Sequence, residues 1–305
     1  MSFETNYALE AVRRGKLAIT AKSDTDVCFI VHLDGFSLMK EFHNLNKNFK
    51  IDEHVGAIYT GLEPDSRILI NLSRDHAQAY RKSYNEPIPV KVLANKVASI
   101  CQNFSQFART CPFGCALLFI GIDSSGPHIF INSHYGDYRS YNSYSIGFNS
   151  STANYYLSTF YREKMTFKEL IDLLLLALDM SINEKLTKYN FKIGYMKSEE
   201  GVFKLFDASE NDNLLKHFKI PTEFEESLSG IKKVYYDMKK RLKEEGLKEL
   251  IIERKYLIEL FDEKLIMMDD PESLPTLSPL AVLVFKKHQM DFIYDKDLVI
   301  LKKND

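Results

Sequence analysis

The sequence lacks tryptophan, and it has only 4 cysteines in 305 residues. So few cysteines in a chain of this length do not form a disulfide framework. Cys28, Cys101, Cys111 and Cys115 are therefore interpreted as free thiols of a protein from a reducing compartment. Basic and acidic residues are nearly equal in number, so the formal net charge is only -2 and the pI is near 6.5. That balance gives no global case for binding nucleic acid or an acidic membrane surface.

Long apolar runs are also missing. The longest is near Leu173–Leu178, which is far shorter than the roughly 20 residues that span a bilayer. The N-terminal sequence MSFETNYALEAVRRGK has no apolar core of the kind found in secretory signals. We therefore expect a soluble intracellular protein without membrane partners. A hydrophobic content of 45% is enough for a core, and the length suggests one or two domains.

Hydrophobic periodicity predicts a mixed α and β chain. Apolar residues at helical spacing run from Tyr7 to Arg14, and Gly15 is a stop signal. Two apolar runs around the turn at residues 22–25 predict a β-hairpin, and a third strand is expected at His54–Thr60. Two long helices are expected next, one opening at residues 61–65 and one following Pro87-Ile88-Pro89.

Residues 115–206 show the same order of strands followed by two helices and further strands. Strands are expected at Cys115–Ile122, His128–Ser133, Tyr138–Ser140 and Ser143–Phe148. Helices are expected from Ser150 and from Thr166, where Thr166 and Glu169 have capping-box spacing. Phe191–Met196 and Val202–Phe206 are the last expected strands. Because helices come in blocks, the order favours an α+β fold in which two antiparallel sheets stack between helix layers, a four-layer αββα sandwich.

The character of the chain changes after Ile220-Pro221. Ile231–Leu265 is rich in lysine and glutamate and has apolar residues at helical intervals, Leu250 and Ile251 among them. Short strands are expected at Leu280–Phe285 and Leu298–Leu301. The sequence thus predicts a core domain over residues 1–220 and a C-terminal extension over residues 221–305, mainly helical and of unknown role.

Several runs carry a resemblance to a known family. YALEAV at residues 7–12, HVGAIYTGLEPDSR at 54–67, NEPIP at 85–89 and CPFG at 111–114 resemble α-type subunits of the 20S proteasome. The runs at residues 59–67 and 86–89 are most similar to the α2-type subunit. The resemblance covers about residues 5–218. The family has a gating tail before its first helix, whereas only Met1–Asn6 precede Tyr7 here: either the sequence is truncated or this subunit contributes little to the gate. The extension has no counterpart in the family.

The resemblance implies the N-terminal-nucleophile hydrolase fold and a non-catalytic role without a cofactor. Implied partners are other α subunits in a hetero-heptameric ring, the β subunits, and regulatory-particle ATPases or other activators. The implied process is ubiquitin-dependent degradation in the cytoplasm and nucleus, and the implied roles are ring assembly, gating of substrate entry and activator docking.

Active members of that fold use an N-terminal threonine exposed by cleavage after a glycine. Here Gly15 is followed by Lys16 and Leu17, which have neither a hydroxyl nor a thiol. Asp34 and Lys47 lie near the places of the supporting aspartate and lysine, but without a nucleophile they cannot form an acyl-enzyme. A self-processing hydrolase that exposes another threonine, serine or cysteine is the alternative.

Lys47 also lies where, by resemblance, α subunits carry a pocket lysine that pairs with the C-terminal carboxylate of an activator. Gly61 and Leu62 would line the same activator-tail pocket. An ammonium group at a groove suits a carboxylate. Lys47 could equally be a solvated lysine, and Lys50 is close enough to exchange places with it after a small register slip.

Other candidate sites have simpler interpretations. Cys111 and Cys115 lack a second cysteine pair at zinc spacing and are interpreted as thiols at a strand entrance. Cys28 and His32 are too far apart along a strand to act as a pair. The lysines of residues 232–241 alternate with acidic residues as on a solvated helix face rather than a nucleic-acid patch. The sequence has no dinucleotide or phosphate-loop fingerprint.

Overall fold

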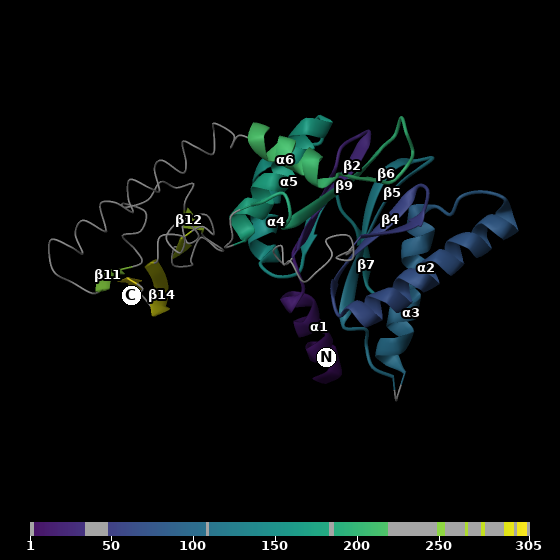
Figure 1. Cartoon of the computed structure of the whole chain (residues 1–305). Helices are drawn as coiled ribbons and strands as arrows, with labels where there is room; N and C mark the ends of the chain where they lie inside the picture. Colours follow the sequence, from purple (N-terminus) through teal and green to yellow (C-terminus); the bar gives the residue numbers. More distant parts are fainter. Residues whose placement is uncertain are drawn as a thin grey trace. The chain divides into compact units, whose positions relative to one another are not determined.

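The structure is a computed structural model. It describes residues 3–33, 48–107, 110–182 and 186–218, and from the C-terminal part only strands at 249–253, 266–267, 276–277, 290–295 and 298–303. The chain divides into two compact units, Met1–Phe218 and Lys219–Asp305. The first unit contains all the expected family motifs and is described first (Figure 1).

One five-stranded sheet is formed from the two ends of the first unit. Its strands follow the order β10-β9-β2-β1-β8, and every neighbouring pair is antiparallel. The bounds are β1 Ala18–Lys22, β2 Asp26–His32, β8 Ser143–Ile146, β9 Phe191–Lys197 and β10 Lys204–Leu205. The hairpin β1–β2 pairs Ala18 with Val31, so the hairpin predicted from its turn is confirmed.

The second five-stranded sheet is contiguous in sequence and has the order β3-β4-β5-β6-β7, again antiparallel throughout. The bounds are β3 Asn48–Asp52, β4 Val55–Gly61, β5 Cys115–Asp123, β6 Gly126–Asn132 and β7 Tyr138–Ser140. Strand β3 was not expected as a separate strand. A turn at Glu53 and His54 returns it onto β4.

Alternation along the strands builds the layers. In β4 and β5, Ile58 and Leu118 belong to the core between the two sheets, whereas Tyr59 and Phe119 belong to the core under the helices. This division follows from the period of two in a strand. Both strands are buried over most of their length, as expected for a sheet covered on both faces.

The helices cover the outer faces of the sheets (Figure 1). Helices α2 (Glu63–Tyr84) and α3 (Val90–Gln106) pack on the second sheet, and α4 (Ser150–Phe160) and α5 (Phe167–Ser181) pack on the first. The predicted four-layer αββα sandwich is therefore confirmed. The capping box of α5 is also confirmed, because the Thr166 side chain accepts a hydrogen bond from the Glu169 amide and Glu169 accepts one from the Thr166 amide.

Two helices lie outside these layers. Helix α1 (Phe3–Arg14) starts four residues earlier than the predicted Tyr7 and packs against the ends of β4 and β5. Helix α6 (Ala208–His217) was not expected. Its N-cap Asp207 accepts hydrogen bonds from the Ser209 and Glu210 amides, so the D-x-x-E spacing in the sequence was the missed signal.

The second unit is described only through its strands. Strands β11 (Glu249–Glu253), β15 (Leu298–Lys303) and β14 (Met290–Asp295) form an antiparallel sheet in that order. A separate pair joins β12 (Ile266–Met267) and β13 (Thr276–Leu277). The strand predicted at Leu298–Leu301 is confirmed.

The helix predicted through residues 250 and 251 was wrong at that place. Leu250, Ile251 and Ile252 form a continuous apolar run with two β-branched members, which suits a strand better than a helix. Within Ile231–Leu265 only β11 is described, and the rest of that range lies outside the described residues. The expected strand Leu280–Phe285 also lies outside them. The assignment of residues 221–305 as a mainly helical domain of its own stays a prediction.

Candidate functional site

The junction between α1 and β1 is the position at which an active member of the family that this sequence resembles would have its nucleophile. Helix α1 runs without interruption into Gly15, whose amide donates hydrogen bonds to the carbonyls of Ala11 and Val12 at 3.1 Å. A β carbon on Gly15 would lie 2.2 Å from Thr60 Oγ1 and 2.3 Å from the Gly61 nitrogen. The chain therefore enters β1 in direct contact with the end of β4, and only glycine fits.

The hydroxyl groups around this junction are donors to backbone carbonyls. Thr60 Oγ1 donates to the Lys16 carbonyl at 3.0 Å and approaches the Val12 carbonyl at 3.4 Å, and Thr60 is fully buried. Within β1, Thr20 Oγ1 donates to the Cys28 carbonyl at 2.9 Å. Leu17, which follows Lys16, is almost completely buried. Both hydroxyls bond to backbone carbonyls, and within the part of the chain that the structure describes no hydrogen bond joins either of them to an imidazole or amine that could act as a base.

Of the predicted site residues, Gly61 and Leu62 are in the described part, and Asp34 and Lys47 are outside it. Gly61 ends β4 with φ +102°, and a β carbon there would lie 2.2 Å from the Gly114 carbonyl oxygen. The Leu62 amide donates to that same oxygen at 2.9 Å. The Leu62 side chain is 52% exposed. The backbone at residues 61–62 is thus fixed, and it presents an apolar side chain to the surface.

Residues 61–62 open helix α2, whose first turn is exposed. The N-cap, Leu62, provides no side-chain cap, so its side chain satisfies none of the first-turn amides. Asp65 accepts a hydrogen bond from the Gly114 amide at 2.7 Å, while Glu63 pairs with Arg67 at 2.7 Å. Two of the motifs that carry the resemblance, at residues 54–67 and 111–114, therefore contact each other at this point.

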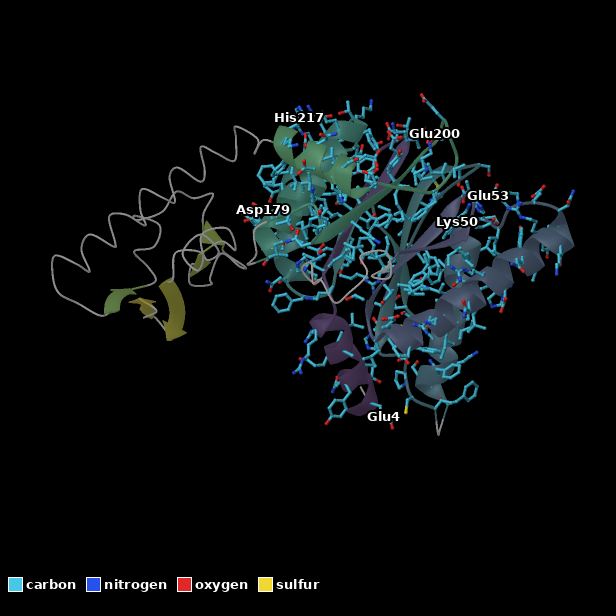
Figure 2. The ribbon with its side chains drawn as sticks, in the orientation of Figure 1. Glu4, Lys50, Glu53, Asp179, Glu200 and His217 are labelled. Carbon is cyan, nitrogen blue, oxygen red and sulfur yellow. The ribbon has the colours of Figure 1, made fainter. Side chains whose placement is uncertain are left out.

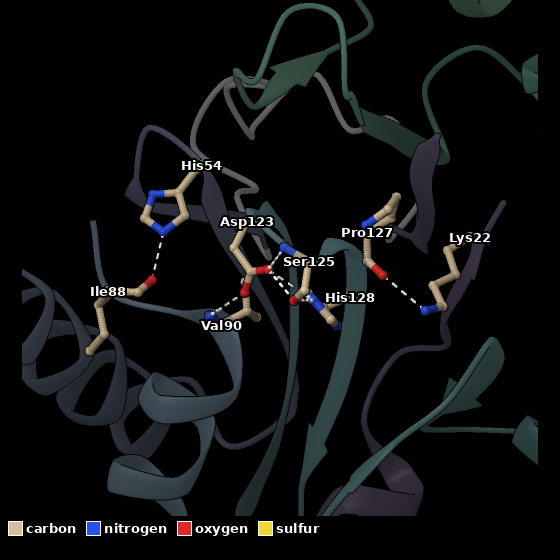
Figure 3. Close-up of polar contacts among 8 residues, drawn as sticks. All are labelled: Lys22, His54, Ile88, Val90, Asp123, Ser125, Pro127 and His128. Carbon is tan, nitrogen blue, oxygen red and sulfur yellow. Dashed lines mark hydrogen bonds and ion pairs between the residues drawn. The ribbon is translucent and has the colours of Figure 1, made fainter. Parts of the chain in front are cut away.

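Sequence reasoning missed a second polar cluster at the β5–β6 turn (Figure 3). Asp123, Ser125 and His128 are the residue types of a catalytic triad. However, Asp123 Oδ1 at 3.0 Å and Ser125 Oγ at 2.8 Å both contact His128 Nε2. A triad histidine uses one nitrogen for the serine and the other for the carboxylate. The cluster therefore lacks the geometry to activate Ser125.

Asp123 instead connects the end of β5 to the β5–β6 turn and to helix α3. Its Oδ1 accepts a hydrogen bond from the Ser125 amide at 2.9 Å, and its Oδ2 accepts one from the Val90 amide in the first turn of α3 at 3.2 Å. Burial raises the pKa of Asp123, but the bonds from Ser125 and Val90 and the nearby His128 outweigh burial and lower that pKa below its ordinary value. The carboxylate stays ionised and anchors α3 on the turn.

Two further contacts hold the same end of the sandwich (Figure 3). The His54 ring donates from Nε2 to the Ile88 carbonyl at 2.7 Å, which fixes the link between α2 and α3. Lys22 Nζ, from the β1–β2 hairpin, donates to the Pro127 carbonyl at 2.9 Å and joins the two sheets. These contacts are structural, and none of them lies at the α1–β1 junction.

The described residues give no indication of a metal or of a membrane span. Among them no group of three or more histidine, cysteine, aspartate or glutamate side chains is placed to hold a metal ion. No described helix combines the length and apolar character needed to cross a bilayer. Cys115 is buried and Cys111 is exposed, and both are free thiols.

A family model described as "Proteasome subunit" matches residues 12–196, the stretch that contains the whole second sheet, strands β1, β2 and β8 with most of β9 from the first sheet, and helices α2 to α5. The chain belongs to the proteasome subunit family. Three relatives, each called proteasome subunit alpha, are 35% identical to it. The one from Saccharolobus islandicus aligns over 214 residues, 70% of this chain and 88% of the relative. Those from Saccharolobus solfataricus and Archaeoglobus fulgidus align over 70% and 68% of this chain, and over 90% and 84% of their own length.

Proposed function

We propose that this proteasome family chain is a non-catalytic subunit of the outer, α-type ring of the 20S proteasome. The single observation that carries the proposal is the α1–β1 junction. A continuous helix leads into β1 where an active member would have a free N-terminal residue, and Lys16 and Leu17 occupy the positions after Gly15. The nucleophile and base of that mechanism are then both missing. The similarity to relatives called alpha subunits supports the same conclusion.

Two measurements test whether the subunit lacks catalytic activity: the intact mass of the mature chain and its hydrolysis of peptide substrates. We expect the chain to keep its N-terminal segment through α1, to hydrolyse no peptide substrate alone, and to co-assemble with other α-type chains. Intact-mass measurement of the assembled subunit reads the first point directly. A mature chain that begins at a threonine, serine or cysteine would support the alternative, a self-processing N-terminal-nucleophile hydrolase, and would refute the proposal.

The proposal extends to the activator-tail pocket of Lys47, Gly61 and Leu62. The exposed Leu62 side chain and the fixed backbone at Gly61 support it, because together they offer an apolar contact on a rigid edge of the surface. Lys47 would supply the ammonium partner. Lys47→Ala and Lys50→Ala are matched variants: loss of activator-stimulated peptide hydrolysis only in the Lys47 variant is expected. Loss only in the Lys50 variant would move the pocket lysine by three residues.

The remaining parts of the proposal concern setting and partners. We propose a place in a ring with other α subunits that stacks on the β subunits, an α2-like ring position, a part in gating, and action in ubiquitin-dependent degradation in the cytoplasm and nucleus. The α2-like sequence runs at residues 59–67 and 86–89 support the ring position. Cross-linking mass spectrometry of the purified particle tests it, since neighbours on both sides would be identified.

A further inference from the structure

A cavity of about 230 Å³, here called the edge pocket, is lined by side chains from residues 131–144. It lies beside β7 and β8. In the described part of the chain β7 is the last strand of the second sheet and β8 is the last strand of the first, so both are edge strands. Clefts that bind small-molecule ligands measure about 300–1,000 Å³. The edge pocket is smaller than these clefts, and it suits side chains of another protein better than a cofactor.

The floor of the edge pocket is apolar. Ile131 of β6 lies opposite Arg139 of β7 in the ladder, so both side chains are on the same face of the second sheet. Ile131 and Tyr144 pack against the core between the two sheets. The rings of Tyr141 and Tyr144 lie with their centroids 4.3 Å apart. An aromatic pair next to an aliphatic side chain therefore forms a surface on which an incoming apolar side chain can pack.

One wall of the edge pocket is fixed by helix α3. Gly136 has φ +95°, and a β carbon there would lie 2.5 Å from the Gln102 nitrogen of α3. Ser105 Oγ, near the end of α3, donates to the Tyr135 carbonyl at 3.1 Å. The Tyr135 ring packs edge-on against His134, with centroids 4.9 Å apart, and His134 is only 3% exposed. Tyr135 is thus held in place before a partner binds, which reduces the entropy lost on binding.

The rim of the edge pocket carries an ion pair that keeps free donors. Arg139 Nε donates to Asp137 Oδ2 at 2.9 Å, and the Tyr135 hydroxyl approaches the same oxygen at 3.5 Å. The two terminal nitrogens of Arg139 form no hydrogen bond within the ranges that the structure describes. The Arg139 side chain is 68% exposed and that of Asp137 is 35% exposed. An approaching group therefore meets the guanidinium first, and its free N–H donors suit the two oxygens of a carboxylate.

We propose that the edge pocket receives an extended segment of a neighbouring α-type subunit, whose carboxylate side chain pairs with Arg139 while an apolar side chain packs on Tyr141 and Tyr144. The inference rests on the proposed function, because a ring places a neighbour against each lateral surface of a subunit. Side chains at positions i and i+2 of an extended segment lie on one face, so one segment can supply both groups. The outer side of β7, which has no neighbouring strand among the described residues, offers backbone groups to such a segment.

Charge and shape together select this occupant. A basic side chain would approach Arg139 before it reached Asp137, whose Oδ2 atom already has two donors, and would be repelled. A small inorganic anion would contact Arg139 and leave the aromatic floor exposed to water. A segment with both a carboxylate and an apolar side chain uses both the rim and the floor of the edge pocket.

Site-specific cross-linking in the purified particle identifies the occupant. Tyr135, which is 37% exposed, is replaced in the full-length chain by the photoreactive amino acid p-benzoylphenylalanine, and mass spectrometry identifies the cross-linked peptides. We expect one dominant product, in another α-type subunit, with aspartate or glutamate two residues from an apolar residue. Cross-links confined to this chain or a second copy of it, to a β subunit or to an activator, or no cross-link, would overturn the proposal. Tyr84, which is 65% exposed at the end of α2, is the control position and should give a different product.

Charge variants test the ion pair with the partner. Arg139→Glu places a like charge opposite the partner's carboxylate, so the yield of the cross-link should fall about tenfold or more. Lys216→Glu is the matched control, because Lys216 is 65% exposed and pairs with Asp212 as Arg139 pairs with Asp137. Its neighbour His217 in Figure 2 lies well apart from strand β7 of Figure 1, which has the same orientation. The Lys216 variant should therefore keep the wild-type yield.

A charge exchange completes the test. Replacing the partner's carboxylate residue, once cross-linking has identified it, by lysine should restore the yield in the Arg139→Glu particle. The same exchange should restore co-assembly if Arg139→Glu prevents it. The proposal is overturned if Arg139→Glu keeps the wild-type yield or if the exchange restores nothing. The proposed function fails separately, through a wild-type chain that does not co-assemble with α-type subunits or that has a processed N-terminus.

Discussion

The close approach of α1 to β4 gives a sharp stability prediction. In Gly15→Ala the new β carbon would overlap Thr60 Oγ1 and the Gly61 nitrogen by about an ångström, and Gly61 is backbone that cannot swing away. Overpacking of this kind costs about 1–3 kcal/mol. Displacing the Thr60 hydroxyl from the Lys16 carbonyl adds roughly 0.5–1.5 kcal/mol. We expect Gly15→Ala to lower the free energy of unfolding of the first unit by about 2–4 kcal/mol.

Gly126→Ala is the matched control. Gly126 has φ +107° but nothing lies within 4 Å of the place of its β carbon, so only backbone strain of about 1–2 kcal/mol is expected. Urea unfolding is followed by hydrogen exchange of the buried β4 and β5 amides, which report the first unit alone. A Gly15→Ala change that costs less than Gly126→Ala would refute the close approach. Thr60→Ala should relieve part of the cost but not all of it, because the contact with the Gly61 nitrogen remains.

Three further predictions follow from single contacts. Thr166→Ala removes the capping box of α5 and should cost about 1 kcal/mol, measured as a lower Tm. Asp52 has its pKa raised by burial but lowered more by the Glu53 amide and by Arg81. The ionised Asp52 carboxylate therefore stabilises the folded chain above about pH 3.9, and this contribution is lost as the pH falls through the lowered pKa. The Asp52→Asn variant should be less stable than wild type at pH 7 and equally stable in strong acid. With a thiol-alkylating reagent at pH 8, mass spectrometry should find Cys111 modified first, because burial raises the pKa of the thiols of Cys28, Cys101 and Cys115.

The predictable part of the fold is the part encoded by periodicity and local chemistry. The hairpin at residues 16–33, the helices after Pro64 and Pro89, and the capping box at Thr166 were all found from sequence because each signal lies within a few residues. Strand β3 was missed, since Asn48–Asp52 has only five residues and takes its strand character from pairing with β4. A pairing partner across a turn is a tertiary fact that a window of sequence does not contain.

The candidate site also has one part that the sequence predicts and one part that depends on contacts between distant residues. The absence of a hydroxyl after Gly15 is a matter of residue identity, and the sequence alone supplies it. The reason why Gly15 must be glycine is the approach of Thr60, 45 residues away, and no local pattern indicates that contact. In the sequence His128 and His134 border the same expected strand, and no local pattern distinguishes one from the other. In the structure His128 contacts Asp123 and Ser125 at the β5–β6 turn, whereas His134 is only 3% exposed in the turn between β6 and β7.

The two ends of the sandwich are held together by different kinds of contact. At the β3–β4 and β5–β6 turns the contacts are side-chain hydrogen bonds and ion pairs, such as Asp52 with Arg81 and Asp123 with the Val90 amide. Burial raises the pKa of both carboxyls, but these contacts outweigh burial and lower it below the ordinary value. At the α1 end the main contact is steric, because Gly15 lets two backbone segments approach without any charge. Such packing does not respond to pH between 5 and 8.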